Sequence, residues 1–341
     1  MTELNGRTPV MADVARLAGV SHQTVSRVVN GQTNLRPATR ERVLEAIRQL
    51  GYRPNTAARS LVTRRSGTIG VIGSKSGFWG PSTVHRAIQA AGREAGYFVS
   101  SANLQSLTRT EFTDAMNHLR DQHVEGIVLI AATDDAVEAA RTQVDQGVPV
   151  VVVEGDEAKA SWTVGVDQVA GAELGTRHLI ELGHHDVLHL AGPTSWTEAR
   201  ARLRGYRNAM YAAGLRPLRH LEGDWSARSG YEAGREVAGR SDVTAVFCAN
   251  DQMALGLLLS LSEAGRSVPG DVSVVGFDDI PEAAYLIPPL TTVRQDFAAV
   301  GQRAIEILRA AIAGDPTPAR LIGPELIVRS SSVPPREGAK A

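Results

Sequence analysis

The apolar residues of the first fifty positions recur at helical spacing and predict three short helices. The first is predicted over residues 9–20, ahead of a turn at Gly19, and its apolar stripe is Val14, Ala15, Leu17 and Ala18. The third begins at Pro37 and ends at Gly51, and its stripe is Val43, Leu44, Ile47 and Leu50. Three helices of this length can share one small core, so residues 9–52 predict an all-α domain.

The middle helix, predicted over 21–30, has two faces of different chemistry. On a wheel of about 100° per residue, one side carries Val25, Val28 and Val29, and the other carries His22, Gln23, Ser26 and Arg27. Ser21 can cap the first turn, and Asn30 with Gly31 can adopt the left-handed conformation that ends a helix. A short helix with long hydrogen-bonding side chains near its start fits a DNA major groove. We therefore expect this helix to read DNA.

Residues 53–66 show almost no apolar periodicity. The stretch starts extended at Pro54 and then offers only marginal helix propensity. We expect a hinge that becomes ordered only against a partner.

From Thr68 onward, short β-branched runs alternate with helix-length amphipathic segments, which is typical of a parallel sheet covered by helices on both faces. Strands are predicted at 68–74, 97–103, 126–132, 149–155, 186–192, 244–250 and 272–279. Helices are predicted near 82–95, 111–121, 136–146, 168–181, 198–213, 229–238 and 251–264. This is too much chain for one ordinary sheet, and an extended joint at 161–166 falls near its middle. Two doubly wound lobes with a cleft between them are therefore expected.

A last helix near 296–312 and a strand in LIGPELIVR must be shared between the two lobes, so several segments should cross from one lobe to the other. The chain then ends in a polar stretch interrupted by prolines. The expected organisation is a helix-turn-helix headpiece at 9–52, a hinge at 53–66, an N-terminal lobe at 67–165 and 296–323, a C-terminal lobe at 166–293 and 324–331, and a tail at 332–341.

Charge is distributed unevenly along the chain. The net charge is −1, yet residues 1–65 hold 11 arginines and no lysine against 4 acidic residues. The remainder holds 25 basic and 33 acidic residues. A small basic domain joined to a larger acidic body indicates that the N-terminal part meets a polyanion such as DNA.

Composition also limits the compartment. Cys248 is the single cysteine, and its apolar surroundings, AVFCAN, favour a buried inert thiol over a nucleophile. No run approaches the ~20 apolar residues that span a bilayer, and the N-terminus lacks an apolar signal segment. A cytoplasmic protein without membrane contact is the expectation.

Enzymatic and metal chemistry find little support in the sequence. We find no residues spaced to form a nucleophile with its base, a phosphate-binding glycine loop or a metal centre. Asp278 and Asp279 are adjacent, so their side chains should diverge rather than form an acid–base pair. His185 and His189 share one face of a predicted strand, but a third ligand is missing. We predict no catalysis, no metal and no cofactor.

The carboxyl ends of the predicted strands carry polar residues, among them Ser74, Glu154, Asn250 and Asp278. Ligands of open α/β sheets bind at these ends. Carboxylates and amides, together with an arginine and a tryptophan, suit a sugar, because they bind hydroxyl groups and cover the apolar face of the ring. Each residue could instead be structural; GFDD, for example, could cap the helix that follows it.

Longer stretches identify a family. MADVARLAGVSHQTVSRVVNG and RPATRERVLEAIRQLGYRPNTAARSL resemble the headpiece and hinge of the lactose/galactose repressor family. EGDWSA, ANDQMALG and IPPLTT followed by QDF extend the resemblance over essentially the whole chain, including a periplasmic-binding-protein-like body. Because leucine heptads are missing from the end of the chain, the expected assembly is a dimer.

The resemblance implies a transcriptional repressor. A homodimer would bind a pseudo-palindromic operator in double-stranded DNA and leave it when a sugar, with a galactoside as first guess, occupies the cleft. The opposite sense, in which the ligand is needed for DNA binding, stays open. A sugar-binding protein without a role in transcription has the right body, but the basic headpiece argues against it.

The resemblance also assigns residues. His22, Gln23 and Arg27 would read bases, and Leu61 would wedge into the minor groove, although it could simply pack between domains. The implied DNA-binding set is Ser21, His22, Gln23, Thr24, Ser26, Arg27, Asn30, Asn55, Ala58 and Leu61. The implied effector-binding set is Ser74, Phe78, Gly80, Pro81, Val84, Glu154, Val166, Trp196, Glu198, Arg202, Trp225, Asn250, Asp278, Gln295 and Phe297.

Several positions depart from the pattern that the resemblance implies. In the headpiece, Val10 and Ala12 replace polar residues and His22 replaces a tyrosine, so the operator should be related but not identical. The departures in the cleft are Glu154, Val166, Trp196 and Glu198. The last two replace small serines, so the rim of the cleft carries larger and more acidic side chains, and the identity of the sugar stays open.

Overall fold

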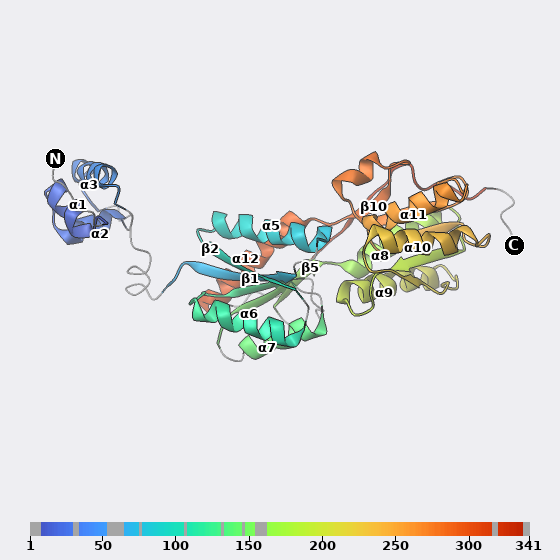
Figure 1. Ribbon diagram of the computed structural model, residues 1–341, viewed down its shortest axis with the longest axis horizontal. Helices are drawn as coiled ribbons and strands as arrows, with labels where there is room; N and C mark the ends of the chain where they lie inside the picture. Colours follow the sequence, from blue (N-terminus) through green and yellow to red (C-terminus); the bar gives the residue numbers. More distant parts are fainter. Residues whose placement is uncertain are drawn as a thin grey trace. The chain divides into compact units, whose positions relative to one another are not determined.

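The computed structural model describes residues 8–29, 34–52, 65–74, 77–105, 108–130, 133–144, 147–153, 162–315 and 320–336. The chain divides into two compact units, Met1–Ser66 and Gly67–Ala341 (Figure 1). Each unit is described by itself.

The first unit contains the predicted three helices, α1 (Met11–Ala18), α2 (His22–Val29) and α3 (Pro37–Leu50). Their shared core is built on Val14, Val25 and Val43, which are fully buried. Gly19 and Gly51 end α1 and α3 with φ of 63° and 61°, a left-handed conformation that glycine adopts without strain.

Two residues expected in this core are exposed instead. Leu17 is 49% exposed and Leu44 is 37% exposed, because the helices meet along a narrower stripe than the sequence pattern predicted. Ala46 is buried in α3, and its small side chain permits a close approach between helices.

The second unit contains two six-stranded sheets, which confirms the expected pair of α/β lobes. The first sheet has the order β11-β5-β4-β3-β1-β2, and all of its pairings are parallel. Its strands are β1 (Thr68–Ser74), β2 (Phe98–Leu104), β3 (Ile127–Ile130), β4 (Val150–Val153), β5 (Thr163–Val166) and β11 (Arg320–Ile322). We call this sheet and its helices the N-lobe.

Helices cover both faces of the N-lobe sheet (Figure 1). One face packs α5 (Trp79–Glu94) and α12 (Phe297–Ala313) around Ile69, Val84 and Val300. The other packs α6 (Arg109–Asp121) and α7 (Asp134–Val144) around Phe112 and Leu129.

The second sheet has the order β12-β10-β9-β8-β6-β7, and only the β10–β12 pairing is antiparallel among those described. Its strands are β6 (Val187–Ala191), β7 (Leu221–Glu222), β8 (Ala245–Cys248), β9 (Ser273–Asp278), β10 (Thr291–Arg294) and β12 (Glu325–Ile327). Its helices are α8 (Gln168–Glu181), α9 (Thr197–Ala212), α10 (Ala227–Ala238), α11 (Asp251–Glu263) and the 3₁₀ turn η1 (Pro281–Tyr285). We call this part the C-lobe.

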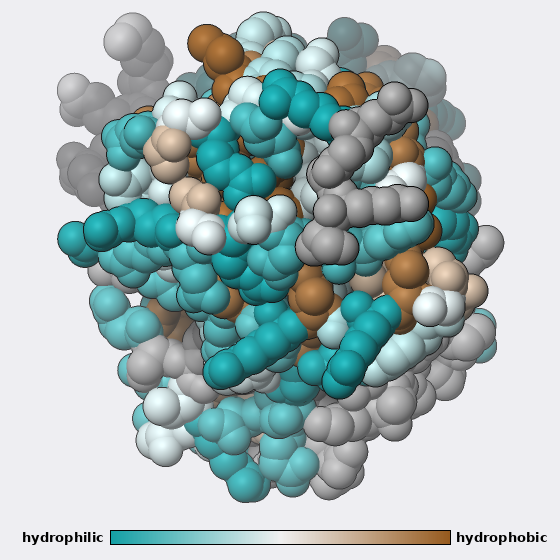
Figure 2. Space-filling view, turned by 90° about the vertical axis from the view of Figure 1, so that its right-hand side faces the viewer, coloured by the Kyte–Doolittle hydropathy of each residue, from teal (hydrophilic) through white to brown (hydrophobic). Residues whose placement is uncertain are grey.

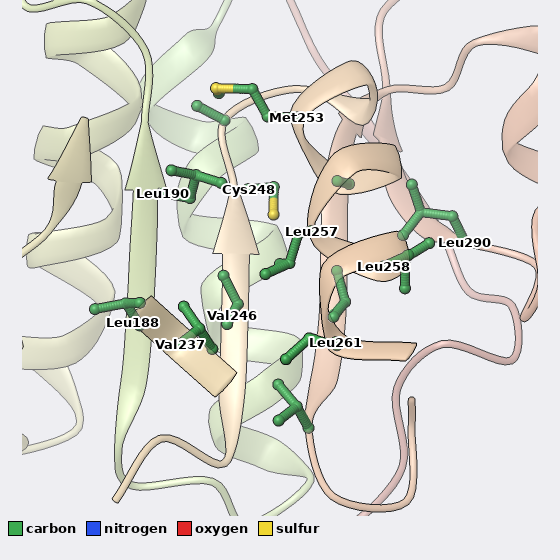
Figure 3. Close-up of a cluster of buried hydrophobic side chains, with 14 of the residues drawn as sticks. Leu188, Leu190, Val237, Val246, Cys248, Met253, Leu257, Leu258, Leu261 and Leu290 are labelled. Carbon is green, nitrogen blue, oxygen red and sulfur yellow. The ribbon is translucent and has the colours of Figure 1, made fainter. Parts of the chain in front are cut away.

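The core of the C-lobe has two layers. Between the sheet and α10 and α11, Leu188, Val246 and Leu257 belong to one buried cluster, whose side chains converge from strands and helices in Figure 3. Cys248 lies in that cluster, and burial raises the pKa of its thiol, so the inert cysteine expected from the sequence is confirmed. On the opposite face, α8 and α9 pack on the sheet through a second buried cluster, which includes Tyr206 of α9, Phe247 and Phe277.

The chain passes between the two sheets three times in the described residues. The passages run from β5 to α8, from β10 to α12, and from β11 to β12. LIGPELIVR forms two strands rather than the one predicted, because Gly323 and Pro324 interrupt it. The two strands join different sheets, so the segment is shared between the lobes as expected.

The last described segment, residues 329–336, is held firmly against the C-lobe. Ser331 Oγ donates to the carbonyl of Val274 at 2.6 Å and accepts from the backbone N–H of Thr291 at 2.8 Å. His184 bonds the carbonyl of Val333 at 2.8 Å. Ser331 therefore supplies, from its side chain, bonds of the kind that a neighbouring strand would make.

Across the described residues, no helix has both the length and the apolar character needed to cross a membrane.

Candidate functional site

The helix α2 carries the residues expected to meet DNA. Ser21 Oγ accepts from the backbone N–H of Thr24 at 3.2 Å, which confirms that Ser21 caps the helix. Val25 and Val28 are buried on one side, whereas His22, Gln23 and Arg27 are exposed. Thr24 and Ser26 are half-buried at the boundary. Asn30, Asn55, Ala58 and Leu61 lie outside the described residues.

A pocket lies between the N-lobe and the C-lobe, and the volume open to water inside it is about 40 Å³. Ten residues from the expected effector set line it: Phe78, Gly80, Pro81, Trp196, Glu198, Arg202, Trp225, Asn250, Asp278 and Gln295. The structure thus brings together side chains separated by more than two hundred positions in the sequence.

Four residues of the expected effector set are placed differently. Val84, Val166 and Phe297 belong to the buried core of the N-lobe, although Phe297 lies just behind Gly80. Ser74 is half-buried at the end of β1 and does not line this pocket. Glu154 lies outside the described residues.

A hydrogen-bonded network forms the polar side of the pocket. Gln295 Nε2 donates to Asp278 Oδ1 at 2.7 Å, and Gln168 Nε2 donates to Gln295 Oε1 at 2.8 Å. Arg202 Nε donates to Gln168 Oε1 at 2.9 Å. The guanidinium also donates to the carbonyl of Ala249 and lies 3.6 Å from Asp278 Oδ1. We call these four side chains the amide–carboxylate network: Gln168, Arg202, Asp278 and Gln295.

The network is buried and therefore electrostatically strong. Arg202 is 5% exposed and Asp278 is 7% exposed. The guanidinium of Arg202 also lies 3.9 Å from the ring centroid of Phe277, which gives a cation–π contact. An ion pair this deeply buried must keep its hydrogen bonds, since loss of one partner leaves an uncompensated charge.

Asn250 is a helix cap as well as a pocket residue. Its Oδ1 accepts from the backbone N–H of Met253 at 2.9 Å, and its Nδ2 donates to the carbonyl of Trp225 at 3.0 Å. The side chain therefore fixes the start of α11 and the backbone that carries Trp225. By contrast, neither aspartate of GFDD caps η1, so that alternative is wrong: Asp278 belongs to the network, and Asp279 binds Arg294 and Arg329.

Asp251, which the sequence reasoning did not single out, ties two pocket segments together. Its carboxylate accepts from the Thr292 hydroxyl at 2.6 Å and from the backbone N–H of Ile280 at 2.9 Å. Complete burial, with the charge of Asp278 nearby, raises its pKa well above the ordinary aspartate value. A Cβ at Gly276 would collide with this carboxylate, so the strand needs a glycine there.

Aromatic side chains form the rest of the wall. The ring of Trp196 contacts Phe78 at a centroid distance of 6.3 Å and Trp225 at 5.9 Å, both edge-on. Trp225 is 6% exposed and rests on Gly192, where a Cβ would lie 2.2 Å from the indole. Within the described part of the chain, the buried Nε1–H of Trp225 has no hydrogen-bond partner.

Two pocket residues have unusual backbone conformations. Trp225 has φ of 74° and Asp278 has φ of 107°, backbone angles that residues other than glycine rarely adopt. Such conformations persist where the surrounding contacts hold them, and they often mark functional sites. Here the contacts are Asn250 behind Trp225 and Gln295 beside Asp278.

Two side-chain contacts cross from lobe to lobe near the pocket. Phe78 at the start of α5 meets Trp196 before α9. Arg200 on α9 pairs with Asp134 on α7 at 3.2 Å, and also donates to the carbonyl of Thr194. The segment 194–200 thus touches the N-lobe at two separate points.

The histidines do not form a metal site in the described structure. His189 is fully buried, its ring lies between Tyr206 and Phe247, and its Nδ1 bonds the carbonyl of Phe247, whereas His185 is exposed. Burial lowers the pKa of His189 to about 3. No group of three or more His, Cys, Asp or Glu side chains in the described residues could hold a metal ion.

Sequence reasoning missed Trp79, Gln168, Asp251 and Gln252. Trp79 and Gln252 were each within one or two positions of a selected residue, in FWGP and ANDQ, so their neighbourhood was a usable signal. Gln168 acts through a partner 127 positions away, and no local pattern could have indicated it.

Two family models match the chain. The model for bacterial regulatory proteins of the lacI family matches residues 10–55, and the model for a periplasmic binding protein-like domain matches residues 176–332.

Curated relatives match over most of their length. The lactose operon repressor of Escherichia coli (strain K12) is 37% identical over 301 residues, 87% of this chain and 82% of that protein. The regulator CelR of Thermobifida fusca is 39% identical over 342 residues, 95% of this chain and 98% of that protein. The repressor PurR of Vibrio campbellii is 33% identical over 331 residues, 94% and 97% of the two chains.

Solved structures agree with these relatives. The lac repressor dimer bound to operator and the anti-inducer ONPF is similar with a TM-score of 0.88 at 34% identity, covering 96% of this chain and all of that chain. The complex of CelR with cellobiose is similar with a TM-score of 0.71 at 34% identity, covering 95% of this chain and all of that chain. The chain therefore belongs to the lacI family of bacterial regulatory proteins, as a ligand-responsive DNA-binding transcriptional regulator and not an enzyme.

Proposed function

We propose that the protein is a sugar-responsive repressor. A homodimer binds a pseudo-palindromic operator through two copies of α2, and a sugar in the pocket between the lobes releases the DNA. The observation that carries this proposal is the composition of that pocket, where a buried amide–carboxylate network faces aromatic side chains from both lobes.

The exposed face of α2 has the chemistry for reading DNA. Gln23 can bond an adenine through two hydrogen bonds and Arg27 a guanine, whereas the hydroxyls of Ser21 and Thr24 suit phosphates. The other DNA contacts we propose are His22 and Ser26 on α2, and Asn30, Asn55, Ala58 and Leu61 beyond the described residues.

The pocket has the chemistry for a sugar. The carboxylate oxygens of Asp278 and Glu198 can accept hydrogen bonds from sugar hydroxyls. The Nε1–H of Trp225, which has no partner among the described residues, can donate to a sugar oxygen. Ligands of two relatives fit this view: one solved complex of the lac repressor holds the anti-inducer ONPF, and the CelR complex holds cellobiose. The sequence suggests a galactoside, so a galactoside is the first sugar to test for binding.

Ligand binding must change the pocket. A volume of about 40 Å³ holds roughly three water molecules and no sugar ring. A sugar can enter only if Trp196 moves or the lobes part, and the contacts Phe78–Trp196 and Asp134–Arg200 must then adjust. Because the ligand favours one arrangement of the lobes over another, it shifts their populations and thereby the affinity for DNA.

The C-lobe offers a surface for the proposed dimer. Leu255 and Leu259 on α11 are 41% and 54% exposed. Tyr285, the last residue of η1, is 85% exposed, and Ile287 just after it is 94% exposed. Figure 2 shows a face of the same lobe on which hydrophilic side chains dominate and apolar ones are scattered. Large apolar side chains exposed on neighbouring elements support a protein–protein interface. Sedimentation should give a dimer, and L259E should shift it toward monomer.

The same pocket and DNA-binding helix could also support the opposite response, in which the sugar is needed for DNA binding. In that case the sugar-bound arrangement of the lobes is the one that binds DNA, and removal of the ligand releases the operator. Because the pocket lies between the lobes, a bound ligand can favour either arrangement of the lobes, and this sense is therefore the second candidate.

The test is a mobility-shift assay with full-length protein and DNA selected from a random pool. We expect a palindromic fragment to be retained without sugar and released by one sugar of a panel. Retention only in the presence of a sugar would establish the second sense. A protein that selects no DNA sequence under either condition would overturn the proposal.

A further inference from the structure

We infer that the effector is a β-linked disaccharide of all-equatorial pyranose rings, and that Trp196 is the residue that determines this preference. The inference rests on the proposed function, because it assumes that a sugar occupies the pocket between the lobes. It replaces a galactoside, the first guess from the sequence.

The two walls of the pocket differ in polarity. Among the described residues, the polar lining side chains Glu198, Arg202, Asn250, Gln252, Asp278 and Gln295 all come from the C-lobe or its boundary. The N-lobe contributes Phe78, Trp79, Gly80 and Pro81, which offer no polar side-chain group except the indole N–H of Trp79. A sugar ring in this pocket therefore bonds the C-lobe through its hydroxyl rim and meets aromatic surface from both lobes.

Aromatic contact from both lobes restricts the configuration of the ring. An aromatic side chain packs well on a sugar face that presents only C–H groups. When every hydroxyl is equatorial, as in glucose, both faces meet that condition. The axial hydroxyl of galactose interrupts one face, and that hydroxyl would be buried against an aromatic ring without a hydrogen-bond partner. Burial of one unsatisfied hydroxyl costs about a 10- to 100-fold loss of affinity.

The number of aromatic side chains indicates two rings. Four of them line the pocket, two from each lobe, namely Phe78, Trp79, Trp196 and Trp225. Four side chains can cover the two faces of two rings. A β link between equatorial positions keeps neighbouring rings extended, so that both can lie in one slot, whereas an α link turns the second ring out of it.

Trp196 occupies the decisive position in this set. It is the side chain that contacts an aromatic ring of each lobe, Phe78 on one side and Trp225 on the other. Its backbone is anchored, because its N–H donates to Pro193 and its carbonyl accepts from Arg200 at the start of α9. The indole is half-buried, so it can shift to admit a sugar while its backbone stays in place.

Isothermal titration calorimetry on the full chain tests this inference with three probes: cellobiose, lactose and maltose. Cellobiose and lactose differ only in the configuration of one hydroxyl, and cellobiose and maltose only in the linkage. We expect cellobiose to bind at least tenfold more tightly than the other two. In W196S the preference for cellobiose over lactose should fall to less than threefold, whereas W196F should keep part of it.

The control is W162F, which alters a tryptophan packed against the core of the N-lobe and away from the pocket. It should leave the preference unchanged, and thermal denaturation of each variant shows whether it is folded. Lactose binding as tight as cellobiose binding, or an unaltered preference in W196S, would overturn the inference while the proposed sugar response stands. If a wide panel of sugars neither binds nor changes operator affinity, the proposed response falls and this inference falls with it.

Discussion

Gln295 donates to the carboxylate of Asp278 at 2.7 Å and accepts from the amide of Gln168 at 2.8 Å. Gln295 follows β10 where the chain passes to the N-lobe, and Gln168 opens α8 just after another passage. One amide therefore joins a pocket carboxylate to two of the three connections between the lobes. A ligand that rearranges the hydrogen bonds of Asp278 acts directly on those connections.

Replacing Gln295 with leucine should weaken the response to sugar. The change removes one hydrogen-bond partner from Asp278 and one from Gln168 in a buried site, so the free energy of unfolding should fall by about 1–3 kcal/mol. Operator affinity without sugar should change little, while release should need at least tenfold more sugar. Q302L alters an exposed glutamine on α12 and serves as the control. Equal release curves for Q295L and the native chain would contradict the role given to Gln295.

Replacing Gln23 with alanine should relax DNA sequence preference rather than abolish binding. Loss of a paired hydrogen bond to one base costs about 1–3 kcal/mol on the preferred operator. Affinity for non-specific DNA should stay the same, because phosphate contacts supply it. Competition assays on operator variants measure the difference. The control Q49A alters an exposed glutamine on α3, and a uniform loss on all DNA in Q23A would show that Gln23 contacts phosphate instead.

Stability should fall as the pH drops below about 6.5. The folded pKa of His189 is about 3, whereas an unfolded histidine titrates near 6.5. Between these values the unfolded chain binds a proton that the folded chain excludes, so the free energy of unfolding decreases by about 1.4 kcal/mol per pH unit. His85, His178 and His184 have lowered pKa values for the same reason, which is burial, and they act in the same direction.

The variant H189Q isolates this contribution. It loses ring stacking and should be less stable at pH 7, but its stability should depend less steeply on pH between 6.5 and 4. Urea denaturation at a series of pH values gives both slopes. If the two slopes coincide, His189 is not the group responsible.

Removing the Ser331 hydroxyl should destabilise the C-lobe. In S331A the carbonyl of Val274 and the N–H of Thr291 lose a partner in a buried site, which should cost about 1–3 kcal/mol. The neighbouring change S330A affects an exposed side chain and should stay within about 0.5 kcal/mol of the native chain. Thermal denaturation of both variants measures the effect. Equal melting temperatures for S331A and S330A would contradict the stabilising role of the Ser331 hydroxyl.

Adding a methyl group at Gly192 should displace Trp225. The new Cβ would lie 2.2 Å from the indole of Trp225, whose backbone carbonyl is fixed by a hydrogen bond from Asn250. The ring must therefore shift, and sugar affinity should fall at least tenfold. At Gly239 a Cβ would meet the carbonyl oxygen of Glu236 at an ordinary contact distance of 3.6 Å, and φ is −80°, so G239A is the matched control. Sugar binding by G192A at native affinity would show that Trp225 does not contact the ligand.

Local periodicity predicted the secondary structure well where it was strong. Six of the seven predicted strands contain an observed one, and the seventh, 97–103, overlaps β2 and stops one residue short of its end. The reason is that β-branched runs such as VVVV at 150–153 have few other stable arrangements in a folded core. The short strands β5, β7 and β10 were missed. In TVGV a glycine weakens the pattern, and Leu221–Glu222 is too short to have one. Their strand conformation depends on pairing with neighbours distant in sequence.

The candidate site was predicted unevenly for a similar reason. Residues with distinctive chemistry inside long motifs, such as Trp225 in EGDWSA, were selected and do line the pocket. Val84 and Val166 were also selected, but their side chains turn into the core, and sequence alone does not give the direction of a side chain. Asp251 was overlooked because its role depends on Thr292, which is 41 positions away.

The two halves of the pocket sit on different parts of the chain. The aromatic side chains lie at the starts of α5 and α9 and in the loop before α10, whereas Gln168 and Gln295 lie where the chain passes between the lobes. Substitutions of the aromatic side chains can therefore change which sugar binds. They leave intact Gln168 and Gln295, which link the pocket to the connections between the lobes. In evolution or in design, a protein of this construction can acquire a new inducer without rebuilding its switch.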